Sequence, residues 1–145
     1  MKEIPKCCEE LKTDPIIVLK ENKRMMIFEN PTQAPVRKIT VDGCVIKDNE
    51  TLRCDYVLVP DYEVEIYVEL KGKDIAHAVK QLESTIEKLS VNAKTIKKLC
   101  FIVSSRSPKL TPEIQKIAKI FKKKYNASFR VKNIQDTYDL STALE

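Results

Sequence analysis

The chain has 145 residues, with 26 Lys and Arg against 21 Asp and Glu, and 43% of its residues are apolar. This composition fits one folded domain spanning residues 1–145, large enough to build a core without disulfides or a structural metal. The longest apolar runs, such as 99–103, fall far short of the ~20 residues that cross a bilayer. The sequence therefore excludes a membrane-spanning helix, and the lack of a secretory signal predicts a cytoplasmic protein.

The five cysteines are an odd number and include no C-x-x-C pair, so we expect reduced thiols rather than a disulfide framework. Adjacent Cys7 and Cys8 are poorly spaced as ligands, and His77 is the only imidazole, so a zinc site is not favoured.

Charge is uneven, because residues 1–72 carry a net charge of −3 and residues 73–145 a net charge of +8. The basic half contains two lysine groups, at positions 94, 97 and 98 and at positions 116, 119 and 122–124. They favour a nucleic acid as partner, although a solvated helix face has the same composition.

A short helix is predicted over 4–11, followed by strands over 25–28, over 36–41 with 45–46, over 52–59 and over 63–71. The last strand is the clearest, because four apolar residues alternate with Glu63, Glu65, Tyr67, Glu69 and Lys71 and so give one apolar and one polar face.

After Gly72 the period changes to that of a helix over 73–90, and a short apolar strand follows over 99–104. Thr111 and Pro112 open a second helix that runs to about Tyr125, and 128–132 reads as an edge strand. The predicted fold class is α/β, with a central mixed sheet flanked by helices.

Two carboxylates are expected to meet on this sheet. If strands 52–59 and 63–71 form a hairpin with a three-residue loop at 61–63, Asp55 faces Glu69 with roughly 4.5–5.5 Å between their Cβ atoms. Together with the backbone carbonyl of Leu70 they make an all-oxygen site suited to Mg²⁺ or Mn²⁺. Lys71, on the same strand face as Glu69, could orient or help deprotonate an attacking water.

With Asp55 and the Glu69-Leu70-Lys71 triplet, the sequence resembles the PD-(D/E)XK nuclease superfamily, whose fold is that of the restriction endonucleases. The resemblance covers about 39–104, with an extension to Lys132 left open. It implies metal-dependent cleavage of DNA, less often of RNA, with Asp55 and Glu69 as metal ligands and Lys71 as catalytic lysine. Gln81 matches a glutamine that members often carry on the following helix.

Two positions depart from the family pattern: Cys54 replaces the proline of the motif, and Thr85 stands where one subgroup has tyrosine. Many members add a glutamate from the first helix, which here would be Glu9 or Glu10. Asp42, beside Gly43, is a further candidate for the metal cluster. His77 is expected at the surface or against substrate.

The predicted function is thus a Mg²⁺- or Mn²⁺-dependent nuclease acting on DNA. A chain of this length has little room for a separate recognition domain, so specific reading would require a homodimer or a partner protein. The alternative functions are a catalytically inactive nucleic-acid-binding module and a protein-interaction module on the same fold, in which Glu69 and Lys71 form only a solvated pair on a sheet edge.

Overall fold

The computed structural model describes residues 1–61, 63–70, 74–106 and 109–143. Its elements are, in chain order, the 3₁₀ turn η1 (Lys6–Cys8), β1 (Glu9–Lys12), β2 (Ile16–Glu21), β3 (Arg24–Glu29), β4 (Val36–Thr40), β5 (Tyr56–Asp61), β6 (Val64–Glu69), α1 (Ile75–Leu89), β7 (Lys97–Ser104), α2 (Pro112–Tyr125), β8 (Ala127–Asn133), β9 (Gln135–Asp139) and α3 (Leu140–Ala143).

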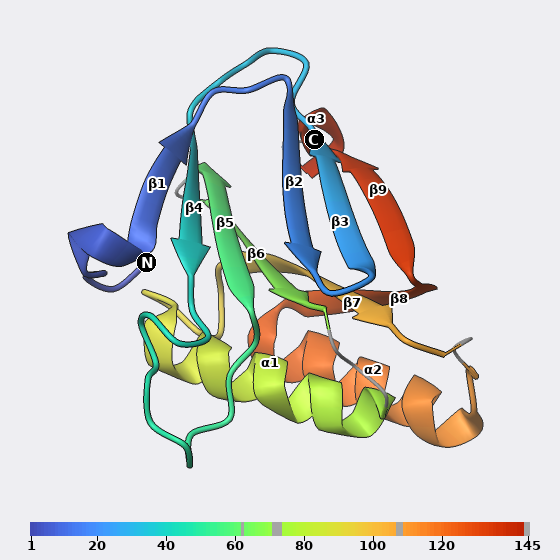
Figure 1. Cartoon of the computed structure of the whole chain (residues 1–145). Helices are drawn as coiled ribbons and strands as arrows, with labels where there is room; N and C mark the ends of the chain where they lie inside the picture. Colours follow the sequence, from blue (N-terminus) through green and yellow to red (C-terminus); the bar gives the residue numbers. More distant parts are fainter. Residues whose placement is uncertain (62, 71–73, 107–108, 144–145) are drawn as a thin grey trace.

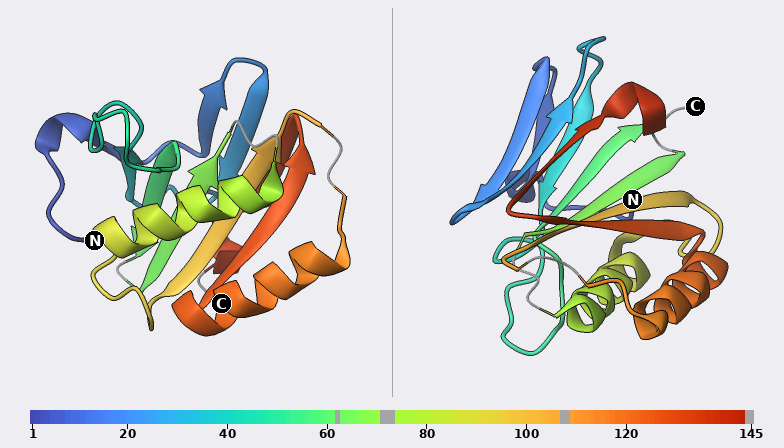
Figure 2. Two further views of the ribbon diagram at one scale, coloured as in Figure 1. Left: turned by 90° about the horizontal axis from the view of Figure 1, so that it is seen from below. Right: turned by 90° about the vertical axis from the view of Figure 1, so that its right-hand side faces the viewer.

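Six strands form a mixed sheet in the order β1-β4-β5-β6-β7-β8, antiparallel as far as β6 and parallel from β6 to β8. Helices α1 and α2 lie along one face of this sheet, and a smaller sheet in the order β2-β3-β9 covers part of the other (Figures 1 and 2). The predicted α/β class and mixed sheet are confirmed, but the second sheet was not predicted.

Each face of the six-stranded sheet has its own apolar core. Toward the helices, Val57 and Ile102 of the sheet pack in one cluster with Leu82 and Ile86 of α1 and Phe121 of α2. Toward the small sheet, the alternate residues of β5, β6 and β7 pack in a second cluster with β2 and β3. The central strands are therefore buried on both sides, as in α/β proteins generally.

The predicted alternation of an apolar and a polar face on β6 is present, but the polar face is not solvated, since all six residues from Val64 to Glu69 are buried. The apolar set packs on the small sheet, while Glu65, Tyr67 and Glu69 turn toward the helix side. Glu65 accepts a 2.8 Å hydrogen bond from the Tyr67 hydroxyl. Burial therefore removes the two glutamates from solvent instead of placing them on an exposed edge.

The predicted helix over 4–11 is also wrong, because Glu9–Lys12 forms an edge strand antiparallel to β4. Strand β2 was not predicted, because Ile16 to Leu19 are all apolar and so show no alternation of apolar and polar residues. In the structure exposed and buried side chains do alternate along this strand, with Ile17 and Leu19 buried. Strand β5 begins later than predicted, at Tyr56.

The helices and the later strands follow the prediction closely. Asp74 caps α1 by accepting hydrogen bonds from the amides of Ala76 and His77, and Thr111 caps α2 with Pro112 in the first turn. Asn126 ends α2 in the left-handed conformation, at φ 52°. Strand β8 is an edge of the large sheet, as predicted.

The expectation that all cysteines are thiols is wrong for two of them. Cys8 and Cys44 form a disulfide with their Cα atoms 5.6 Å apart, whereas Cys7, Cys54 and Cys100 are free thiols. In the described part of the chain, no helix combines the length and apolar composition of a membrane span.

Candidate active site

Asp55 and Glu69 lie opposite each other at the open end of the β5–β6 hairpin. The strands pair Tyr56 with Val68 and Leu58 with Ile66, which is the predicted alignment and sets Asp55, the next residue, against Glu69. Beyond Leu58 a bulge shifts the register, so Asp61 pairs with Val64 and the predicted three-residue loop is wrong.

Both carboxylates are almost fully buried, with 3% of Asp55 and 2% of Glu69 exposed. Burying a charged group is costly unless hydrogen bonds or an opposite charge compensate it. For Asp55 one compensating contact is clear, because the Leu70 amide donates a 2.7 Å hydrogen bond to Oδ2. The Leu70 side chain itself belongs to the core beneath the small sheet.

Two other predicted features of this strand end stay predictions. Lys71 lies outside the described residues. The amide of Leu70 donates to Asp55, and the assignment of its carbonyl oxygen as a metal ligand is not tested by this contact.

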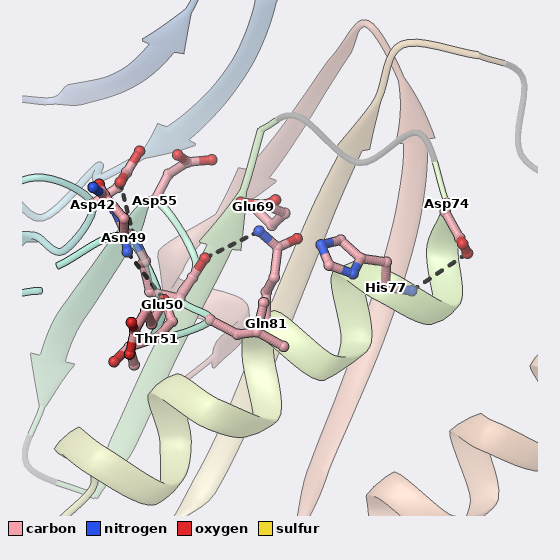
Figure 3. Close-up of a pocket in the computed structure, with 11 residues that line it drawn as sticks. Asp42, Asn49, Glu50, Thr51, Asp55, Glu69, Asp74, His77 and Gln81 are labelled. Atoms are coloured by element: carbon pink, nitrogen blue, oxygen red, sulfur yellow. Dashed lines mark hydrogen bonds and ion pairs between the residues drawn. The ribbon is translucent and has the colours of Figure 1, made fainter.

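A hollow of about 510 Å³ opens beside Asp55 and Glu69, between the sheet, the loop 49–53 and the first turns of α1 (Figure 3). Its charged and ionisable lining comprises Asp42, Glu50, Arg53, Asp55, Glu69, Asp74 and His77. Among the described residues of this lining carboxylates outnumber basic groups, an arrangement that favours a bound cation.

A second hollow, of about 350 Å³, shares Asp42 and Asp55 with the first and is lined on its other side by Lys20 and Glu21. Here carboxylate oxygens of Glu21, Asp42 and Asp55 all lie within 4.8 Å of one another. Clustered carboxylate oxygens are the hard donors that Mg²⁺ and Mn²⁺ prefer. Glu69 lines only the first hollow and is not part of this described group of three.

Asp42 is positioned by a tight turn after β4. The turn is closed by hydrogen bonds from the amides of Gly43 to Ile46 O and of Ile46 to Val41 O, both 3.0 Å, and Gly43 has a φ of +79° that suits glycine. Arg53 donates from Nε to Asp42 Oδ1 at 3.0 Å. Asp42, an additional candidate from the sequence, thus joins the carboxylate group.

The third carboxylate of this group comes from Glu21, the last residue of β2, which sequence reasoning missed. Glu9 and Glu10, the predicted candidates for an added glutamate, are instead on β1: Glu9 accepts two hydrogen bonds from Arg37, and Glu10 pairs with Lys12. No local sequence signal distinguishes Glu21, because its position depends on how the small sheet packs on the large one.

Gln81 also lines the first hollow, and its amide nitrogen donates to the backbone carbonyl of Arg53 at 3.2 Å (Figure 3). One turn further, Thr85 Oγ1 accepts a hydrogen bond from the Cys54 amide and donates to the carbonyl of Gln81, each at 2.9 Å. Hydrogen bonds from α1 therefore fix the backbone of Arg53 and Cys54, the two residues that precede Asp55.

The Cys54 thiol does not add a nucleophile to this site. It is fully buried, and burial raises the pKa of the Cys54 thiol well above its ordinary value, as do the nearby carboxylates of Glu69 and Asp55. A raised pKa keeps the thiol protonated at neutral pH, and the thiol form is unreactive.

Asp48 and Arg53 make hydrogen bonds within the loop that lines the first hollow. Asp48 accepts hydrogen bonds from the amides of Thr51 at 2.6 Å and Glu50 at 2.9 Å, and these bonds lower the pKa of Asp48. Arg53 donates to the carbonyls of Asp48 and Thr51 from the same loop. His77, exposed on the first turn of α1, faces the hollow from the opposite side (Figure 3).

The predicted lysine groups do not lie at these hollows. The described residues of α2 line neither of them. Lys98 is only 1% exposed, and its ammonium donates to the carbonyls of Asn92, Ile96 and Tyr125. Burial lowers the pKa of Lys98, and its role is structural rather than that of a phosphate contact.

Of the residues that the sequence predicts for the site, the structure brings together Asp42, Asp55, Glu69 and Gln81. It adds Glu21, which the sequence did not predict. Comparisons of the chain with protein-family models, with curated proteins and with solved structures gave no match.

Proposed function

We propose that this chain is a Mg²⁺- or Mn²⁺-dependent nuclease that hydrolyses phosphodiester bonds in DNA, on a core of the restriction-endonuclease type. The observation that carries the proposal is the convergence of buried Asp55 and Glu69 from paired strand ends on one hollow, with Asp42 and Glu21 beside them. Carboxylates that lie this close repel one another, and a divalent cation relieves that repulsion.

The donor set fits such a cation. Asp55, Asp42 and Glu21 offer carboxylate oxygens within 4.8 Å of one another, and Glu69 offers a fourth carboxylate on the adjoining wall. No histidine or thiolate contributes to the group of three, so the site suits hard cations over zinc or copper. When bound, the cation would offset negative charge on a phosphate oxygen and favour ionisation of water.

The chain's own residues have separate tasks in this proposal. Lys71 would orient the attacking water or neutralise charge on the phosphate, as the resemblance implies. Gln81 acts as a positioning residue, because its amide is bonded to the carbonyl of Arg53 and so holds the segment leading into Asp55.

The two hollows suggest how a nucleic acid would lie. They meet at Asp42 and Asp55, and Lys20 lines the far hollow while Arg53 lines the near one. A phosphate backbone crossing from one hollow to the other would pass the carboxylate group and meet one basic side chain on each side.

The test is a cleavage assay on linear duplex DNA, circular duplex DNA, single-stranded DNA and RNA, each with Mg²⁺, with Mn²⁺ and with a chelator. The variant Glu69→Gln keeps the volume of the buried side chain and removes its charge. Glu63→Gln is the matched control, because Glu63 is an exposed glutamate at the other end of the same hairpin. All proteins are purified identically, so that a contaminating nuclease would appear in every sample.

We expect metal-dependent cuts in DNA by the parent chain and by Glu63→Gln, and none by Glu69→Gln or in the presence of chelator. Equal cleavage by Glu69→Gln would contradict the assignment. Salt-sensitive DNA binding with no cuts would identify a binding module instead, and a chain that binds no nucleic acid would point to a protein-interaction role.

A further inference from the structure

Three cysteine sulfurs converge at the edge of the large sheet, away from the carboxylates described above. The Sγ atoms of Cys7, Cys8 and Cys44 all lie within 4.8 Å of one another. Two of them form the Cys8–Cys44 disulfide, and the third, the free thiol of Cys7, lies 3.8 Å from Cys8 Sγ.

Secondary structure, and not the disulfide alone, brings these residues together. Cys8 directly precedes β1, whose first residue Glu9 pairs with Ile39 of β4. The turn after β4 carries Cys44, whose amide donates to Val41 O at 3.2 Å. The strand ladder and this closed turn would keep the two cysteines adjacent after reduction of the disulfide.

Although Cys7 and Cys8 are adjacent in the sequence, a spacing expected to disfavour a zinc site, their sulfurs are spaced in the structure as metal ligands are. With bonds of about 2.3 Å and tetrahedral angles, two thiolates on one Zn²⁺ are about 3.8 Å apart. The Cys7 and Cys8 sulfurs are already 3.8 Å apart, and breaking the disulfide lets Cys44 Sγ move away from Cys8 Sγ to a similar distance. Cys8 is buried, Cys44 is partly buried and Cys7 is exposed, so an ion could enter from the Cys7 side.

We propose that the reduced chain binds one Zn²⁺ through the Sγ atoms of Cys7, Cys8 and Cys44, with solvent at the fourth position. The disulfide and the metal are mutually exclusive, because a sulfur in a disulfide is not a thiolate ligand. Thiolates are soft donors, so this site differs in chemistry from the carboxylate group and is independent of the proposed nuclease function.

The experiment compares the full chain in its disulfide form with the same chain reduced by a phosphine, which becomes the phosphine oxide as it takes up oxygen from water and releases two thiols. Both forms are freed of reductant and kept under argon. Thiol counting in denaturant should give three free thiols for the first form and five for the second. Zn²⁺ is then titrated in competition with a chromophoric chelator, with excess Mg²⁺ present to occupy carboxylates.

We expect one Zn²⁺ per reduced chain, and binding at least about a hundredfold weaker in the disulfide form, which retains every carboxylate but lacks two thiolates. Cd²⁺ should give a thiolate charge-transfer absorption in the reduced form only. Equal affinity in the two forms, or no binding by the reduced form, would overturn the proposal.

Cys7→Ser tests the third ligand without disturbing the fold, because Cys7 is exposed and outside the disulfide. It should weaken Zn²⁺ binding by the reduced chain by at least about tenfold. Lys6→Ser, at the exposed neighbouring position, is the matched control and should bind like the parent. An unchanged affinity in Cys7→Ser would refute the three-sulfur site.

Discussion

The backbone amide of Leu70 donates a 2.7 Å hydrogen bond to Oδ2 of Asp55, which ties the end of β6 to the residue just before β5. Asp55 also donates its own amide to the carbonyl of Val68, at 3.0 Å. Asp55 is therefore a structural link as well as a candidate ligand, and replacing it has two separable consequences.

Asp55→Asn should separate these roles. The asparagine carbonyl can still accept the Leu70 amide, so we expect the free energy of unfolding to stay within about 1 kcal/mol of the parent, whereas Asp55→Ala leaves a buried amide unsatisfied and lowers it by ~1–3 kcal/mol. Both variants should lose metal-dependent cleavage. Urea unfolding and a plasmid-cutting assay measure the two effects, and an active Asp55→Asn variant would exclude the carboxylate as a ligand.

Thr85 supports the same segment from α1. Its hydroxyl accepts from the Cys54 amide and donates to the Gln81 carbonyl, and the side chain is fully buried. Thr85→Val keeps the shape but orphans the Cys54 amide, which should lower the free energy of unfolding by ~1–3 kcal/mol. We expect cleavage to fall by roughly tenfold or more, because Asp55 follows directly.

Thr85→Ser is the control for that substitution. It retains the hydroxyl and should recover cleavage, although the lost methyl group costs about 1 kcal/mol of stability. If Thr85→Ser does not restore cleavage although both variants have the same urea midpoint, the Thr85 hydroxyl does not help to position Asp55.

Glu21 gives a test of the carboxylate group that the resemblance alone would not suggest. Glu21→Gln should raise the metal concentration needed for half-maximal cleavage by about tenfold, as loss of a supporting metal contact typically does. Glu29→Gln, an exposed glutamate at the far end of the next strand, is the control and should leave that concentration unchanged. If both variants respond alike, the effect is one of net charge only.

Lys20 and Lys119 distinguish the proposed DNA path from the basic face of α2. Lys20 lines the second hollow, whereas Lys119 is exposed on α2, whose described residues line neither hollow. Lys20→Gln should weaken DNA binding and reduce the slope of log affinity against log salt by about one. Lys119→Gln should leave the slope unchanged, and the reverse pattern would move the binding surface to α2.

The sequence was most informative where local pattern and packing agree. The alternation around Val68, the apolar run ending at Ser104 and the cap at Thr111 are local signals, and each predicted its element correctly. The facing of Asp55 and Glu69 was predicted from a three-residue loop at 61–63. That loop is wrong, but the predicted facing holds because the bulge beyond Leu58 restores the same alignment.

The failures concern features decided by distant parts of the chain. No local pattern assigns Glu9 and Glu21 to different roles, yet one binds Arg37 on the sheet edge and the other lies in the carboxylate group. The Cys8–Cys44 disulfide spans 36 residues and depends on the β1–β4 pairing, which no local pattern predicts. The burial of Lys98 follows from its carbonyl partners in two other segments, the loop before β7 and the end of α2.

The pair Glu9 and Arg37 predicts a pH-dependent contribution to stability at the β1 edge. Arg37 donates to Glu9 from Nε at 2.9 Å and from Nη2 at 2.7 Å, and this hydrogen bonding lowers the pKa of Glu9 below its ordinary 4.5. A lowered pKa means that the folded chain favours the ionised carboxylate. The contribution is therefore complete above the pKa of the unfolded state and is lost as the pH falls through the lowered pKa of the folded state.

Glu9→Gln should make the chain less stable by about 0.5 kcal/mol at neutral pH, a small effect because both partners are partly exposed to solvent. The difference from the parent should shrink as the pH falls through the folded pKa of Glu9, where the parent carboxylate is protonated as well. Urea midpoints measured across that range, with the disulfide intact in every sample, check the prediction. Glu3→Gln, at an exposed position of the segment before η1, controls for the loss of one negative charge. A Glu9→Gln difference that persists undiminished in acid would show that the glutamate stabilises β1 by packing and not through its charge.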